Sequence, residues 1–157
     1  MKRLALLSIA LIALGFIGLA FTLRVEAGEK SDSKVKVTAT AGKLGADGKQ
    51  TIAVTIAIEK GWYIYANPVQ SEDFEDNRTT VSIKAKGKVE AKVNYPAGKS
   101  KAMGKIKYNV YEDKVTIEAL VQRSAGDTSP LEVSVGVNSC SQKGVCLLPA
   151  TVKLMVP

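Results

Sequence analysis

The sequence predicts an all-β domain built as a sandwich of antiparallel strands. From Val35 onward, apolar residues recur at every second position, which is the period of a half-buried strand. Glycine, proline and other turn-forming residues interrupt these runs at regular intervals. No segment after the N-terminal leader has an apolar stripe of helical period. Together, these observations favour about eight short strands.

An N-terminal signal or anchor helix is expected to precede this domain. Residues 4–23 form an unbroken apolar run behind the basic residues Lys2 and Arg3, and the residues around Ala27 fit cleavage after it. The run is 20 residues long, close to the roughly 20 that span a bilayer, so an uncleaved anchor is the alternative. Both cases predict export to the periplasm or another extracytoplasmic location, and the second adds a tether to the inner membrane.

Three parts of the chain follow from this reading. They are a leader over residues 1–27, a polar linker over residues 28–34 and one domain over residues 35–157, a length typical of a single core.

Eight segments of the domain satisfy the strand pattern. The strongest is 51–58, where large apolar residues alternate with Thr and Ala, and the next, 62–65, is a compact aromatic strand. Segments 81–85 and 89–93 are expected to form a hairpin around Gly87. In chain order the predicted strands cover residues 35–39, 51–58, 62–65, 81–85, 89–93, 115–121, 131–137 and 151–156. Their number and spacing are typical of an immunoglobulin-like sandwich.

Two longer segments lack a strand period. Residues 71–76 are acidic and predict a solvated loop with Phe74 as an apolar anchor. Residues 97–107 are rich in Gly and Lys and predict a loop of the kind that often carries function.

The composition excludes several classes of function. The chain has no histidine, and this argues against most hydrolase mechanisms and transition-metal sites. Its net charge is +7, and it is +5 without residues 1–27, which hold three basic residues and one acidic one. The lysines are scattered without interleaved aromatic residues, so we expect a solvated basic surface and no nucleic-acid binding.

The two cysteines, Cys140 and Cys146, are the chemically distinctive residues. They lie between the predicted strands 131–137 and 151–156, so they flank a hairpin tip, where a disulfide is geometrically natural. Such a disulfide would stabilise the folded state only weakly. In the chain-entropy model, closing a loop of about seven residues stabilises the fold by roughly 2.4 kcal/mol, against roughly 4.7 kcal/mol for a loop of a hundred residues. Spacing alone leaves a passive bridge and a redox-active pair both open.

Four motifs give the sequence a resemblance to a known family. They are residues 61–65 (GWYIY), 95–96 (YP), 110–113 (VYED) and 140–149, the last with a C-x5-C pair, Gly144 and Pro149. In order and approximate spacing they resemble the N-terminal domain of the thiol:disulfide interchange protein DsbD, over most of residues 35–157.

The resemblance implies a periplasmic immunoglobulin-like domain whose cysteine pair cycles between disulfide and dithiol without a metal or organic cofactor. Electrons would come from a thioredoxin-like C-x-x-C protein and pass to exported thiol proteins. By position, Cys146 corresponds to the cysteine that forms the mixed disulfide, and Cys140 to the one that resolves it. The membrane electron carrier of DsbD does not fit in 157 residues, so the donor is expected to be a separate protein.

The resemblance also implies a cap that shields the pair until a partner docks. Its candidates here are Lys101, Met103 and Gly104, whereas well-known members of the family have acidic and aromatic residues there. We expect Tyr111 and Pro149 to flank the pair.

The aromatic residues Trp62, Tyr63 and Tyr65 are expected mainly to pack the sheet, with one edge available to flank the pair. The alternative to a thiol-disulfide exchange domain is a secreted immunoglobulin-like binding module with a purely structural disulfide.

Overall fold

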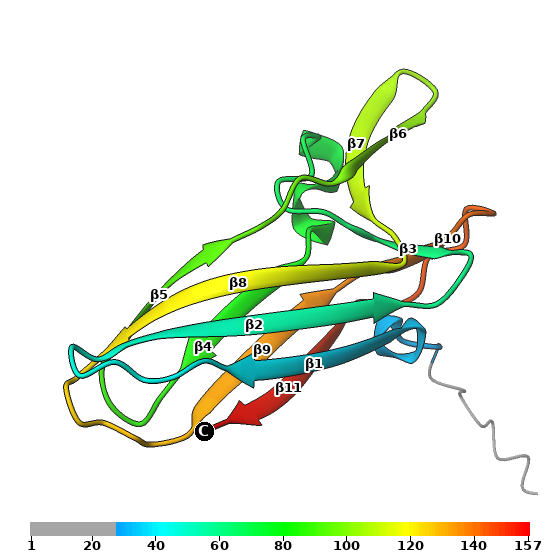
Figure 1. Ribbon diagram of the computed structural model, residues 1–157. Helices are drawn as coiled ribbons and strands as arrows, with labels where there is room; N and C mark the ends of the chain where they lie inside the picture. Colours follow the sequence, from blue (N-terminus) through cyan, green and yellow to red (C-terminus); the bar gives the residue numbers. More distant parts are fainter. Residues whose placement is uncertain (1–27) are drawn as a thin grey trace, which may run out of the picture.

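The computed structural model describes residues 28–157, and these residues form eleven β-strands and two short 3-10 helices (Figure 1). The strands are β1 (Val35–Ala41), β2 (Lys49–Ile58), β3 (Trp62–Tyr65), β4 (Thr80–Lys84), β5 (Val89–Asn94), β6 (Lys99–Met103), β7 (Ile106–Tyr111), β8 (Lys114–Arg123), β9 (Leu131–Val137), β10 (Ser139–Ser141) and β11 (Ala150–Val156). The 3-10 helices are η1 (Ser31–Lys34) and η2 (Glu72–Asn77). The predicted leader, residues 1–27, lies outside the described residues. Within residues 28–157, no helix has the length and hydropathy needed to span a membrane.

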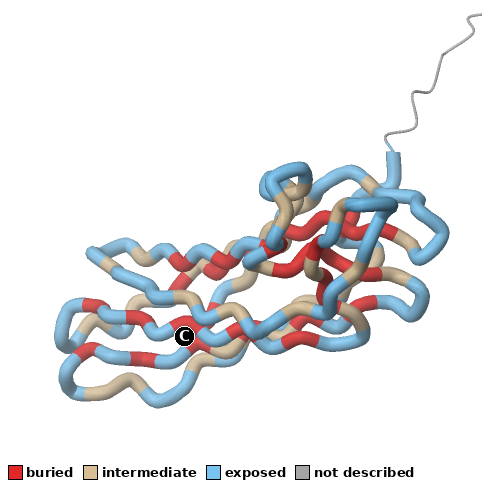
Figure 2. Tube along the Cα trace, turned by 90° about the horizontal axis from the view of Figure 1, so that it is seen from above, coloured by how far each residue is buried: buried red, intermediate tan, exposed pale blue. Residues whose placement is uncertain are grey.

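Two of the three sheets enclose the main core. One has the strand order β1-β2-β8-β5 and the other the order β11-β9-β4, and all their pairings are antiparallel. Buried and exposed positions alternate along the strands (Figure 2), so each strand sends every second side chain inward. The fully buried side chains include Ile52, Ile56, Ile117, Leu131 and Val133. Each contributes about 1.5–3 kcal/mol through removal from water. The predicted all-β antiparallel architecture is confirmed.

The third sheet, with the order β10-β3-β7-β6, lies at one end of the sandwich (Figure 1). Strand β3 is buried on both faces. Ile64 joins the main core, whereas Tyr63 and Tyr65 face a second apolar cluster. Strand β10 lies within the connection between β9 and β11 and pairs with β3, which places Cys140 opposite Tyr63. This pairing brings the cysteines to the aromatic strand.

The structure corrects the predicted number and pairing of strands. The segment 97–107, predicted to be a loop, forms the hairpin of β6 and β7, which projects from the body of the domain (Figure 1). Strand β6 escaped detection because it is an edge strand with almost no buried side chain and hence no apolar period. The predicted hairpin of 81–85 with 89–93 is also wrong, since β4 and β5 belong to opposite sheets.

The segment 28–34 is also more ordered than the predicted polar linker. It forms the 3-10 helix η1, buries Ser31 and makes a parallel bridge from Lys30 to Leu148. The acidic segment 71–76 largely forms η2, and its Phe74 packs against the second apolar cluster as predicted.

Candidate active site

The cysteines lie on the two arms of a tight hairpin. The Leu147 N–H donates to the Ser139 carbonyl (3.0 Å), and the Ser141 N–H donates to the Val145 carbonyl (2.7 Å). The turn closes with a 3.0 Å bond from the Gly144 N–H to the Ser141 carbonyl, and Gly144 has φ +85°. Such a three-residue loop requires a left-handed residue, which glycine adopts without steric cost.

Cys140 and Cys146 form a disulfide across this hairpin, with their Cα atoms 4.0 Å apart. They face each other between the two hydrogen-bonded rungs, so they occupy a non-hydrogen-bonded pair of an antiparallel ladder. Cα atoms are closest at such positions, at about 4.5 Å. The hairpin therefore holds the sulfurs in bonding range.

The two cysteines differ in their exposure to solvent. Cys140 on β10 is 0% exposed and belongs to the second apolar cluster, whereas Cys146 is exposed. Two apolar neighbours of Cys146 are also exposed, Val145 at 59% and Leu148 at 53%. A partner thiol can therefore approach Cys146, while Cys140 lies beneath the surface.

Aromatic residues surround the buried sulfur. The cluster contains Tyr63 and Tyr65 from β3, Tyr108 from β7 and Phe74 from η2, with ring centroids of contacting pairs 4.8–6.5 Å apart. The hydroxyl oxygen of Tyr65 lies 3.6 Å from the Sγ of Cys140. Because an oxidised sulfur has no proton, the hydroxyl is the donor in this contact.

Two tyrosines of this cluster, Tyr63 and Tyr65, are held in the protonated form by their surroundings. Burial raises the pKa of Tyr65, and the neighbouring Tyr108 raises it further. Burial also raises the pKa of Tyr63, whose hydroxyl lies 3.5 Å from that of Tyr108. Tyr65 can therefore serve as a hydrogen-bond donor to the sulfur.

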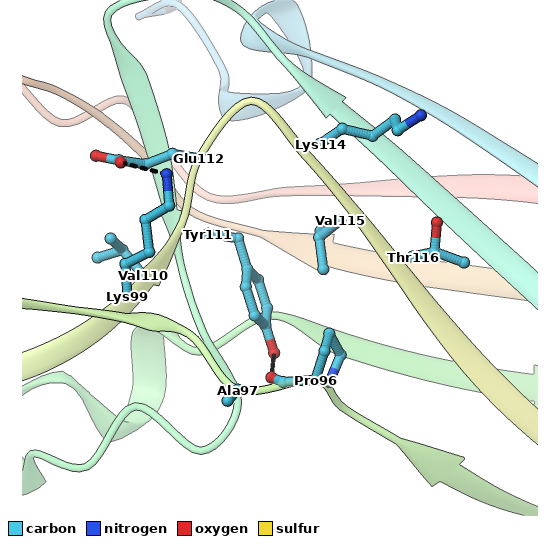
Figure 3. A pocket seen from close by; sticks show the side chains of 9 residues that line it. All are labelled: Pro96, Ala97, Lys99, Val110, Tyr111, Glu112, Lys114, Val115 and Thr116. Carbon is cyan, nitrogen blue, oxygen red and sulfur yellow. Dashed lines mark hydrogen bonds and ion pairs between the residues drawn. The ribbon is translucent and has the colours of Figure 1, made fainter.

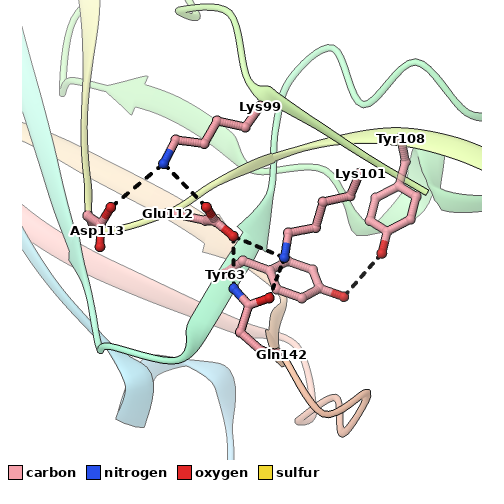
Figure 4. A network of polar contacts seen from close by, with 7 residues as sticks. All are labelled: Tyr63, Lys99, Lys101, Tyr108, Glu112, Asp113 and Gln142. Carbon is pink, nitrogen blue, oxygen red and sulfur yellow. Dashed lines mark hydrogen bonds and ion pairs between the residues drawn. The ribbon is translucent and has the colours of Figure 1, made fainter. Parts of the chain in front are cut away.

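A polar network joins the cysteine hairpin to the β6–β7 hairpin (Figure 4). Glu112, just after β7, accepts a 2.8 Å hydrogen bond from the side-chain amide of Gln142 and pairs with Lys101 (3.0 Å) and Lys99 (3.3 Å). Lys101 also donates to the Gln142 side chain and lies 4.5 Å from the centroid of the Tyr63 ring. Glu112 is thus the common partner of three side chains around the hairpin turn.

This network predicts a specific dependence of stability on pH. Hydrogen bonds from Gln142 and then Lys101 lower the pKa of Glu112 from its ordinary 4.5 to about 2. A lowered carboxyl pKa stabilises the folded state above the unfolded-state value, and this contribution is lost as pH falls toward the folded-state value. The wild-type protein should therefore lose stability as the pH falls from about 4.5 to 2, and we expect Glu112→Gln to lose less over the same range. The measurement is the urea midpoint of unfolding as a function of pH. Glu118→Gln, on an exposed face of β8, is the matched control. Identical pH profiles for the two variants would contradict the network.

The cap candidates lie on the β6–β7 hairpin but differ in their contacts. Lys101 touches the cysteine hairpin through Gln142, as described above. Met103, 56% exposed, and Gly104, at φ +61°, form the far end of the β6–β7 hairpin. Phe74 of η2, rather than Met103, is the residue that packs on the rings of Tyr65 and Tyr108.

Tyr111 and Pro149, which were expected to flank the cysteine pair, lie outside the second apolar cluster that contains Cys140. The Tyr111 side chain belongs to the main core, and its hydroxyl donates to the Pro96 carbonyl (2.8 Å) beside an open pocket of about 250 Å³ (Figure 3). Pro149 lies three residues after Cys146 and lines a different pocket of about 230 Å³ with Asn138.

Several residues that contact the cysteine hairpin were not predicted from the sequence. One hydrogen bond joins Glu112 to Gln142, which are 30 positions apart in the sequence. Another joins Ser31 to Ser139, which are 108 positions apart. No local sequence pattern indicates either contact. Tyr65 was expected mainly to pack the sheet, yet it also contacts Cys140. Tyr63 and Tyr65 share a face of β3 because they are two residues apart in a strand, and the pairing of β10 with β3 decides what that face meets.

Comparisons with known proteins place these features in a family. The family described as "Thiol:disulfide interchange protein DsbD, N-terminal" matches residues 21–156. No protein of curated function matches the sequence.

Among solved structures, the chain is similar to the N-terminal periplasmic domain of ScsB from Proteus mirabilis. The two are 20% identical with a TM-score of 0.55, over 77% of this chain and 46% of that one. This chain thus spans less than half the length of the ScsB domain, and the likeness concerns the fold.

Two structures from Neisseria meningitidis are also similar. The reduced N-terminal domain of DsbD is 18% identical, with a TM-score of 0.46 over 76% of this chain and 82% of that one. A complex of the DsbD and PilB N-terminal domains is 12% identical, with a TM-score of 0.49 over 76% and 80%. From the match over residues 21–156, the chain belongs to the family of the N-terminal domain of the thiol:disulfide interchange protein DsbD.

Proposed function

We propose that this protein is a periplasmic thiol-disulfide exchange domain that relays electrons through Cys140 and Cys146. It accepts them from a thioredoxin-like C-x-x-C protein and passes them to exported thiol proteins. The observation that supports this proposal most strongly is the unequal exposure of the two sulfurs, with Cys146 open to solvent and Cys140 buried. Family membership supports the same chemistry.

Reduction of the domain begins at the exposed sulfur. A thiolate of the donor attacks the Sγ of Cys146, the S–S bond breaks, and Cys140 leaves as a thiolate. The donor is then joined to Cys146 by a mixed disulfide. The second thiol of the donor attacks its own sulfur in that bond and releases Cys146, so two electrons have moved and the donor has become a disulfide.

Oxidation runs the same chemistry toward the acceptor. The Cys146 thiolate attacks a disulfide of the exported protein, one acceptor cysteine leaves, and a second mixed disulfide forms. Cys140 then attacks the Sγ of Cys146 and releases the second acceptor cysteine as a thiol. The domain returns to its disulfide form, with both electrons on the acceptor.

Tyr65 assists the step in which Cys140 leaves. Its protonated hydroxyl, 3.6 Å from the Cys140 sulfur, is placed to donate to the thiolate that forms there. Hydrogen bonds to ionised groups are stronger than those to neutral ones, so the contact strengthens as negative charge develops.

The experiment that tests this function is the equilibrium of the full chain with reduced thioredoxin. An exchange domain is reduced by thioredoxin in its folded state, whereas a structural bridge remains oxidised until the chain unfolds.

A further inference from the structure

The segment directly after the predicted leader contacts both arms of the cysteine hairpin. We call residues 28–34 the N-terminal strap. Its Lys30 makes a parallel bridge with Leu148, two residues after Cys146. Its Ser31 bonds to Ser139, the residue directly before Cys140.

Ser31 is the residue that connects the two arms. Its backbone N–H donates to the Leu148 carbonyl at 2.8 Å. Its Oγ accepts the Ser139 N–H at 2.8 Å, and its carbonyl accepts the Ser139 hydroxyl at 3.0 Å. Ser31 and Ser139 are both 0% exposed, so water cannot replace these bonds without an opening of the structure.

The neighbouring contacts make the attachment a short ladder rather than a single point. The Leu148 N–H donates to the Glu29 carbonyl at 3.2 Å. Lys34 forms ion pairs with Glu29 and Glu59, and its Nζ lies 5.2 Å from the centroid of the Trp62 ring. The strap is thereby fixed to the body of the domain as well as to the cysteine hairpin.

We propose that Ser31 is a positioning residue for the redox pair, which keeps the two thiols of the reduced domain close enough to re-form their bond. This inference rests on the proposed function of the pair. In the oxidised state the S–S bond itself holds the arms together. In the reduced state that restraint is gone, and the bonds of Ser31 to residues 139 and 148 act together with the two hydrogen-bonded rungs of the hairpin to limit the separation of the arms. Groups held in reacting geometry behave as if at high local concentration, so the strap favours the disulfide over the dithiol.

The experiment compares serine variants of the full chain at equilibrium with glutathione. In this reaction two glutathione thiols deliver two electrons and two protons to the protein sulfurs and become one glutathione disulfide. Ser31→Ala removes the acceptor of the Ser139 N–H, and we expect it to increase the equilibrium constant for reduction about tenfold, a shift of about 30 mV toward a more oxidising potential. Ser33→Ala is the matched control, since the Ser33 hydroxyl is exposed and, among residues 28–157, bonds only within the strap, to Glu29 and Lys30.

A second measurement separates positioning from general destabilisation. Urea unfolding of the oxidised chain, and of the chain reduced with dithiothreitol, gives the effect of each variant on both redox states. By linkage, Ser31→Ala is expected to raise the unfolding equilibrium constant about tenfold more in the oxidised state than in the reduced one, because the strap favours the disulfide form of the folded protein. Equal effects on both states, with an unchanged potential, would overturn the inference.

A second variant and the unfolding comparison allow the role of Ser31 to be tested even if Ser31→Ala does not fold or thioredoxin does not reduce the chain. If Ser31→Ala does not fold, Ser139→Ala removes only the hydroxyl bond to the Ser31 carbonyl and is expected to shift the equilibrium about threefold in the same direction. Failure of thioredoxin to reduce the wild-type chain would reject the proposed function. The unfolding comparison would still decide the role of Ser31, because dithiothreitol replaces the physiological donor.

Discussion

Cys140→Ser is expected to leave a reactive thiol at Cys146 that captures a thioredoxin-like partner, whereas Cys146→Ser leaves a thiol at Cys140 that reacts at least about 100-fold more slowly. The reason is exposure: Cys146 is open to solvent, but Cys140 is 0% exposed and can react only after a local opening of the structure. An opening that costs about 3 kcal/mol slows the reaction by roughly 100-fold.

The capture is measured with a thioredoxin that keeps only its attacking cysteine, activated as a mixed disulfide with thionitrobenzoate. Release of the coloured thiol gives the rate, and a non-reducing gel shows the captured complex. In denaturant both variants should react at the same rate, a control for intact thiols. Efficient capture by Cys146→Ser and none by Cys140→Ser would reverse the assigned roles.

Tyr65→Phe is expected to slow reduction of the domain by thioredoxin about tenfold or more. The substitution keeps the ring and its contacts with Phe74 and Tyr108 but removes the hydroxyl next to the Cys140 sulfur. A hydrogen bond to a charged group contributes about 1.5–3 kcal/mol, and the lower value already corresponds to a tenfold change in rate.

The matched control for this variant is Tyr63→Phe. Tyr63 lies on the same face of β3, but its hydroxyl faces that of Tyr108. Trp62, the only tryptophan in the sequence, pairs with Ser141 next to the disulfide, so its fluorescence offers a continuous record of the reaction. Equal rates for the two variants would remove Tyr65 from the mechanism.

Much of the fold was predictable because its physical cause is local. Strands with one buried face alternate apolar and polar residues, and this pattern identified segments that the structure places in the sandwich, such as 51–58 and 131–137. Alternation shows which residues share a face but not which sheet a strand joins, so β4 and β5 were paired wrongly. The exposed strand β6 buries too little to leave any pattern.

The candidate site also has features that local sequence predicts and features that depend on contacts between distant segments. The position of the two cysteines between neighbouring strand signals predicted a bridged hairpin, because both cysteines belong to one short segment. The roles that we infer for Tyr65 and Ser31 depend on contacts between distant parts of the sequence. Tyr65 is 75 positions away from Cys140, and Ser31 is 108 positions away from Ser139. Such contacts follow from the assembly of the sheets, which a single sequence does not specify.

The central claim is that the bond between Cys140 and Cys146 opens and re-forms in the folded protein. Its most direct test is the reduction potential of the full-length wild-type chain at equilibrium with glutathione and thioredoxin, with folding followed by circular dichroism. The account predicts a folded protein throughout and a potential of about −180 to −270 mV, within reach of thioredoxin-like donors. A potential below about −300 mV, or reduction only after unfolding, would contradict it and leave a β-sandwich with a structural disulfide.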